Sequence, residues 1–150
     1  GATICSELIL KIYQEAQALD EFPGSNYEGT TVRAGAKALQ VRGLIESYHW
    51  GWSLDDVLLA LRSVGPVVVG TNWYATMRES EPIGRIKVGG QVVGGHAYVM
   101  DGVNIPREII RIKNSWGRLW ARRGFAYISF SDLERLIRED GEVMLAVETP

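Results

Sequence analysis

The spacing of apolar residues changes near Gly65, and this change constrains the fold more than any other feature of the chain. Before it, apolar residues recur every three or four positions, as they do on one face of a helix. After it, short runs rich in Val and Ile are separated by Gly, Pro and Asn, which is the pattern of strands joined by turns. We therefore predict an α+β fold in one domain, with a helical lobe at 1–63 followed by an antiparallel sheet lobe at 65–150.

The helical lobe is expected to contain three helices. The first spans 7–19, carries one apolar stripe and ends at the Pro- and Gly-containing segment 22–26. The stripe consists of Cys5, Leu8, Ile9, Ile12, Ala16 and Leu19. The second helix begins at Thr30 or Thr31 and stops before Gly43, and the third runs from Ser53 to Ser63.

The sheet lobe is expected to hold six strands and one short helix. The predicted strands are 67–70, 86–88, 96–103, 109–113, 125–129 and 143–147. Ser131 and Glu134 have the spacing of a capping box, which predicts a helix that continues to Arg138.

The composition excludes several classes of function. The net charge of −2 arises from interspersed acidic and basic residues, so no surface for nucleic acid is expected. No apolar run approaches the ~18 residues that span a bilayer, and the chain does not open with a basic and then apolar leader. We expect a soluble protein without membrane contact, either cytoplasmic or associated with a virion.

Cysteine and histidine are too few for a metal site. Cys5 is the only cysteine, so it forms no disulfide within the chain and no thiolate cluster. His49 has no Asp, Glu or Cys at a ligand spacing. We predict neither a metal nor an organic cofactor.

Two polar residues stand at the ends of predicted strands. His96 opens an apolar strand directly after Gly94 and Gly95, so its ring can face an open cleft. Asn114 follows the strand at 109–113, and its amide oxygen can accept an imidazole N–H and fix the ring's tautomer. Taken alone, each residue fits a structural role better: a hydrogen-bonded core histidine and a polar turn.

Together, three motifs resemble those of the papain-like cysteine peptidases. They are Gly65-Pro66-Val67-Val68-Val69, Gly95-His96-Ala97 and Lys113-Asn114-Ser115-Trp116-Gly117 with Trp120, in the order and approximate spacing of that superfamily. The resemblance covers 65–128 and implies a papain-like fold with the site in a cleft between the lobes. It further implies that His96 is the general base, that Asn114 orients it and that Trp116 shields it, with Ser115 and Gly95 in support.

The amino half resembles a branch of this superfamily found among phage and actinobacterial proteins. The resemblance rests on short motifs at 12–17, 28–30, 34–37 and 72–74. One position departs from the family pattern, because Ala121 follows Trp120 where family members usually have glycine. Its methyl group matters only if this position requires a positive φ.

The nucleophile is the larger departure. Papain-like enzymes carry their cysteine in a Gly-x-Cys-Trp or related motif with a Gln upstream, and this sequence has neither. Cys5 lies near a first helical turn, which stabilises a thiolate. However, it also belongs to the apolar stripe, and its separation from His96 is about forty residues shorter than the family's ~130–150. Three alternatives stay open: Cys5 is the nucleophile, the nucleophile lies upstream of Gly1, or the fold has lost its activity.

The sequence thus supports two hypotheses about function. The first is a cysteine peptidase that hydrolyses peptide or protein substrates through Cys5, His96 and Asn114. The second is an inactive papain-like domain that binds a peptide or protein as a structural module, for example in a phage particle. A thiol within about 3–4 Å of His96 distinguishes the first from the second. Transfer of the acyl group to an amine instead of water stays open, as do the substrate and the oligomeric state.

Overall fold

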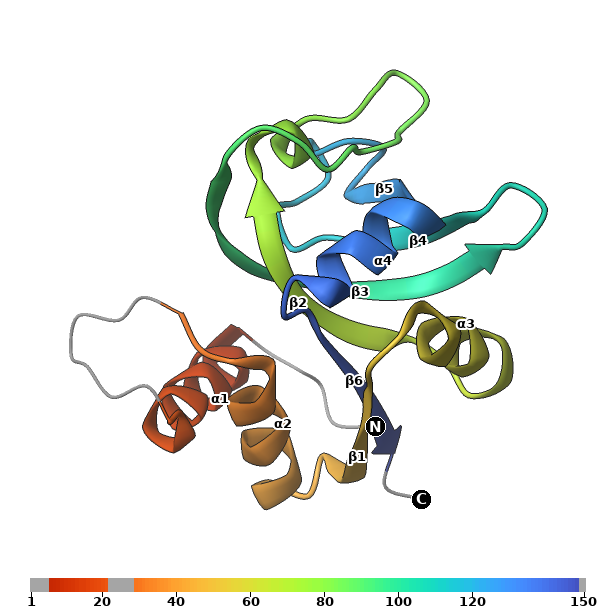
Figure 1. Cartoon of the computed structure of the whole chain (residues 1–150). Coiled ribbons are helices and arrows are strands. Elements are labelled where there is room, and N and C mark those ends of the chain that lie inside the picture. Colours follow the sequence, from red (N-terminus) through yellow and green to blue (C-terminus); the bar gives the residue numbers. More distant parts are fainter. Residues whose placement is uncertain (1–5, 22–28, 149–150) are drawn as a thin grey trace. The chain divides into compact units, whose positions relative to one another are not determined.

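The computed structural model describes residues 6–21 and 29–148 (Figure 1). The chain divides into two compact units, one formed by 1–49 with 146–150 and the other by 50–145. The described parts combine helices with antiparallel strands, which confirms the predicted α+β class.

The described part of the first unit contains two helices and most of one strand. These elements are α1 (Ser6–Leu19), α2 (Val32–Val41) and β1 (Ile45–Gly51). The helices pack through the small residues Ala16, Ala34 and Ala38, with Ile12 against them. Arg42, at the end of α2, donates two hydrogen bonds of 2.6 Å to the carboxylate of Glu15 on α1. Ile9 belongs to the predicted apolar stripe but is 57% exposed, so only part of that stripe is buried.

Both ends of α2 form as the sequence predicts. Thr31 Oγ1 accepts a hydrogen bond of 3.1 Å from the N–H of Ala34. Gly43 follows the helix with a φ of +67°, which a residue without a Cβ adopts at little cost. The strand β1 was not predicted, because we expected the chain before Gly65 to be mainly helical. The turn at 22–26 lies outside the described residues.

The second unit contains the remaining elements. They are α3 (Leu54–Ser63), β2 (Val67–Tyr74), the 3-10 helix η1 (Ala75–Arg78), β3 (Val92–Asn104), β4 (Ile109–Lys113), β5 (Phe125–Ser129), α4 (Phe130–Arg138) and β6 (Glu142–Glu148), whose end lies in the first unit. Ser53 caps α3 as predicted, since its Oγ accepts from the N–H of Asp56 at 3.1 Å. The predicted cap of α4 was wrong, because Ser129 and not Ser131 accepts from the N–H of Asp132.

The strands of the second unit form an antiparallel sheet in the order β6-β2-β3-β4-β5. Alternate residues share a face of such a sheet. We call the face that carries Val69, Met100 and Ile112 the inner face, because these side chains join those of α3 and α4 in one buried core. The opposite face, which carries Arg111 and Tyr127, is called the outer face.

Three features of the second unit differ from the sequence prediction. Residues 86–88 form no strand, although Ile86 is fully buried and its N–H donates to the carbonyl of Tyr127 at 2.9 Å. The strands β2 and β3 pair well beyond their predicted ends, with Trp73 opposite Gly94. We expected α3 in a helical lobe, whereas it lies in the same compact unit as the sheet.

Candidate active site

His96 lies on the inner face of β3, beside β2. Its backbone is opposite Thr71, so Trp73, two positions further along β2, shares the same face. The imidazole is half-buried. Among the described residues, nothing lies within 4 Å of the point where a Cβ at Gly95 would stand, so the backbone beside the ring is uncovered there.

Asn114 meets this ring from the end of β4. Its side chain follows Ile110 and Ile112 on the inner face, and the residue is 8% exposed. The backbone N–H of Asn114 donates to the carbonyl of Gly124 at 2.9 Å, which fixes the residue directly after the strand. Asn114 Oδ1 lies 2.8 Å from His96 Nε2, so the structure brings these two predicted site residues together.

The partner of Nε2 determines which ring nitrogen carries the proton. An amide oxygen only accepts hydrogen bonds, so Nε2 must donate to it, and the neutral ring then keeps its lone pair on Nδ1. Asn114 Oδ1 also accepts from the backbone N–H of Ser115 at 2.8 Å. These two donors hold the amide oxygen in place, and the ring presents Nδ1 as a base.

Aromatic side chains surround the imidazole. The ring centroids of Trp73 and Trp116 lie 4.8 Å and 4.9 Å from that of His96, and Tyr98 is at 6.1 Å. Trp73 is 3% exposed, whereas Trp116 is 42% exposed and forms the solvent-facing side of this enclosure. Apolar walls exclude water from the hydrogen bond between His96 and Asn114, which strengthens it. Trp116 therefore lies where the sequence placed a shield.

Trp73 was not among the predicted site residues. The sequence shows only an aromatic residue after a Val-rich strand, which is typical of a core position. Its contact with His96 arises from the register of β2 against β3, which no local motif reveals.

A hydroxyl pair lies beneath the enclosure. The hydroxyls of Thr71 and Tyr98 are 3.1 Å apart, and both residues are buried. Burial raises the pKa of the Tyr98 phenol far above its usual value, although the hydrogen bond with Thr71 opposes this shift. The Tyr98 phenol therefore stays uncharged and forms a buried wall of the enclosure.

The turn after Asn114 contains unusual backbone angles. Gly117 and Gly124 have φ values of +80° and +90°, and a Cβ at Gly124 would lie 3.2 Å from the carbonyl oxygen of Gly117. Ala121 has a φ of +44°, so the position where the family pattern has glycine does require a positive φ. Trp120 anchors the turn, because its Nε1 donates to the carbonyl of Arg78 at 3.0 Å.

Cys5 lies outside the described residues, so its predicted role as nucleophile stays a prediction. His49 is exposed on β1. Within 6–21 and 29–148, no three His, Cys, Asp or Glu side chains gather closely enough to hold a metal ion. No helix in these ranges is both long and apolar enough to cross a membrane.

The arrangement of these elements matches solved structures of cysteine proteases. Xylellain, a cysteine protease from Xylella fastidiosa, matches with a TM-score of 0.73 at 17% identity, over 93% of this chain and 69% of that one. The proCathepsin B S9 of Trypanosoma congolense gives 0.56 at 18% identity, over 71% of this chain and 37% of its own. Procathepsin L 3 from the larval midgut of Tenebrio molitor gives 0.52 at 14% identity, over 85% and 38%.

These matches define the class of fold. The chain has the papain-like fold, as its sequence motifs predicted. It spans well under half of both procathepsins, and at these identities the likeness concerns the fold alone. No protein-family model and no curated protein sequence matches the chain, so the phage and actinobacterial branch stays a prediction.

Proposed function

We propose that this protein is a cysteine peptidase in which His96 is the general base and Asn114 orients it. The observation that carries the proposal is the 2.8 Å contact between His96 Nε2 and Asn114 Oδ1. The aromatic enclosure of that contact and the fold shared with cysteine proteases support it further.

The free lone pair on Nδ1 sets the chemistry. A thiol beside Nδ1 transfers its proton to the ring, and the resulting thiolate attacks the carbonyl carbon of a peptide bond. The C–N bond then breaks, the imidazolium gives its proton to the leaving amine, and a thioester remains. Water, deprotonated by the ring, hydrolyses the thioester and regenerates the thiol. Throughout the cycle, Asn114 keeps the ring in the orientation that these transfers need.

We assign the thiol to Cys5, the one cysteine of the sequence. Its place shortly before α1 favours the assignment, because backbone N–H groups at a helix start stabilise a thiolate. The lack of a Gly-x-Cys-Trp motif favours the second candidate, an inactive papain-like module that binds a peptide or protein. The two candidates differ in the reactivity of Cys5.

Alkylation tests this difference directly, because every labelled molecule reports the same residue. The rate of iodoacetamide labelling is measured by intact mass between pH 5 and 9 for the wild type, His96→Ala and His49→Ala. An ion pair between Cys5 and His96 predicts rapid labelling at pH 5–6 that disappears in His96→Ala. It predicts no change in His49→Ala, which removes the other histidine. Hydrolysis of a peptide with a fluorogenic amide is followed in parallel.

An ordinary thiol gives the opposite pattern. Labelling then rises only near pH 8.5, the usual thiol pKa, and is the same in all three proteins. That result, together with no peptide hydrolysis, would rule out Cys5 as nucleophile and leave two alternatives, a nucleophile upstream of Gly1 or the binding module.

A further inference from the structure

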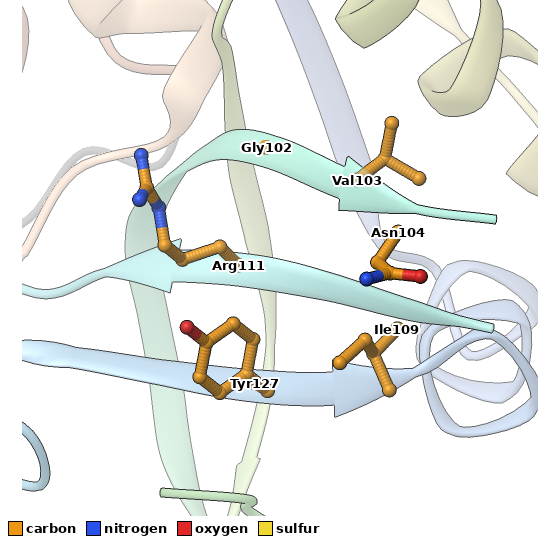
Figure 2. Close-up of a pocket in the computed structure, with 6 residues that line it drawn as sticks. All are labelled: Gly102, Val103, Asn104, Ile109, Arg111 and Tyr127. Carbon is orange, nitrogen blue, oxygen red and sulfur yellow. The ribbon is translucent and has the colours of Figure 1, made fainter. Parts of the chain in front are cut away.

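A hollow lies on the outer face of the sheet, away from His96. Along β4, Ile109 and Arg111 alternate with the inward-facing Ile110 and Ile112, so the outer-face side chains point away from Asn114. A hollow of about 220 Å³ lies there. Figure 2 shows side chains that line it, among them Asn104 from β3, Ile109 and Arg111 from β4 and Tyr127 from β5.

A larger cavity of about 510 Å³ shares Asn104, Ile109 and Tyr127 with this hollow. Three arginines from separate segments also line it: Arg85, Arg107 and Arg122. Its lining residues include no carboxylate. In a chain with a net charge of −2, this gathering of positive charge is local and is not a property of the whole protein.

No ion pair joins any of the three arginines to another residue within 6–21 and 29–148, and each arginine belongs to a different backbone segment. The backbone of Arg85 forms an isolated β-bridge with that of Tyr127, which joins the segment of Arg85 to the edge strand β5. The side chain of Arg122 passes over Gly84. A Cβ at Gly84 would lie 2.5 Å from Arg122 Cδ, so only glycine leaves room for the arginine here. Arg107 belongs to the short turn between β3 and β4.

Arg85 has an unpartnered donor beside this cavity. Its Nε is buried and has no hydrogen-bond partner among the described residues, which is uncommon for a buried donor. Arg85 contributes to the lowered pKa of Glu81, but Lys87 is the first cause of that shift and forms the ion pair, at 2.6 Å. The guanidinium therefore leaves positive charge beside the cavity.

The remaining lining adds an apolar surface. Ile83, which is 65% exposed, lies with Ile109 and the ring of Tyr127 around the same cavity. The volume falls within the ~300–1,000 Å³ of small-molecule sites, which combine apolar walls with a few placed polar groups. Guanidinium groups bind phosphate and carboxylate oxygens in pairs of hydrogen bonds, and several of them together suit a dianion.

We propose that this cavity binds a phosphate monoester with an apolar body, the phosphate between Arg85, Arg107 and Arg122 and the apolar part against Ile83, Ile109 and Tyr127. The site does not depend on the proposed peptidase activity, because it uses the opposite face of β4. It gives the protein a second ligand, which the reaction at His96 neither supplies nor consumes.

Titration with phenyl phosphate tests the site, with binding followed by calorimetry and by the backbone amide signals of Ile109 and Tyr127. We expect Arg107→Gln and Arg122→Gln each to raise Kd by about tenfold, the effect of losing one charge-assisted contact. Arg107→Gln changes an exposed turn residue, so this variant keeps its fold. Arg62→Gln removes the same charge at an exposed position of α3 and should leave Kd unchanged. Inorganic phosphate and benzoate should both bind more weakly.

Several results would overturn the proposal. One is an absence of binding to the wild type, and another is equal Kd values for wild type, Arg107→Gln and Arg122→Gln. If Arg62→Gln weakens the binding of phenyl phosphate as much as Arg107→Gln does, the effect is one of general charge and not of a site. Tighter binding of benzoate would reject a phosphate ligand, and equal binding of inorganic phosphate would reject the apolar part.

Discussion

The two faces of β4 carry different kinds of interaction within the six residues from Ile109 to Asn114. On the inner face, Ile110 and Ile112 are fully buried and lead to Asn114, a neutral amide bound to His96 inside aromatic walls. On the outer face, Ile109 is half-buried and Arg111 forms an ion pair with Asp101 at 2.8 Å. One strand therefore supports two sites. The site on the inner face depends on packing, and the site on the outer face depends on charge.

This difference predicts how each face responds to change. A buried hydrogen bond enclosed by aromatic side chains depends on exact position and is little exposed to ions in solution. Exposed charges tolerate displacement but are screened by salt within about 10 Å at 0.1 M. Variants on the inner face should therefore alter stability and geometry, whereas variants on the outer face should alter affinity for ions and salt dependence.

The largest effect on stability is expected from Ile112→Ala. Ile112 is fully buried in the core of the second unit, and its loss leaves a cavity, so the free energy of unfolding should fall by about 2–5 kcal/mol. Ile109→Ala, on the outer face of the same strand, should cost no more than about 1 kcal/mol because less area is buried. Urea denaturation measures both. Equal costs would mean that the two faces are packed alike.

The next effect concerns the proposed activity. Asn114→Ala removes the acceptor of His96 Nε2, so the ring loses its fixed orientation, and we expect kcat for peptide hydrolysis to fall by about 10²-fold. The loss should be the same at 50 mM and 500 mM salt. Gln91→Ala removes an exposed amide elsewhere in the unit and is the matched control. A loss of rate that salt changes several-fold would contradict the assignment of Asn114 to a packed contact shielded from solvent.

A smaller, stabilising effect is expected at the turn that joins β4 to β5. Ala121 has a φ of +44°, which strains a residue with a Cβ, so Ala121→Gly should raise the free energy of unfolding by about 0.5–1 kcal/mol. Ala126→Gly, in the buried strand β5, should lower it by a similar amount. Thermal and urea denaturation of the two variants give the comparison. Destabilisation by both would show that Ala121 is not strained.

The inner face could be largely predicted from the sequence because its signals are local. Alternation in 109–113 and the motif that begins at Asn114 indicate a strand and its polar end. The hydroxyls of Thr31 and Ser53 likewise predict helix starts, since a cap bonds only to its own first turn. The contact between His96 and Asn114 followed from a resemblance and not from spacing alone.

The rest depends on pairing between distant segments. β1 forms where residues 45–51 lie next to β6 in the sheet, a neighbour nearly a hundred positions away along the chain. Trp73 reaches His96 only through the register of two strands. The cavity of the outer face gathers Arg85, Arg107 and Arg122, none of which belongs to a motif. A single sequence gives no sign of such contacts.

The smallest effect is expected on the outer face, from Asp101→Asn. This change removes the ion pair with Arg111, whose side chain is 45% exposed. The guanidinium stays over the ring of Phe125, with Arg111 Cζ 5.2 Å from the ring centroid. Exposed pairs contribute at most about 1 kcal/mol, so the free energy of unfolding should fall by less than that at low salt. At 1 M salt, where screening acts within about 3 Å, the difference from wild type should vanish. If it persists, Arg111 and Asp101 form a packed contact like the one between His96 and Asn114, and the division between the two faces fails at this pair.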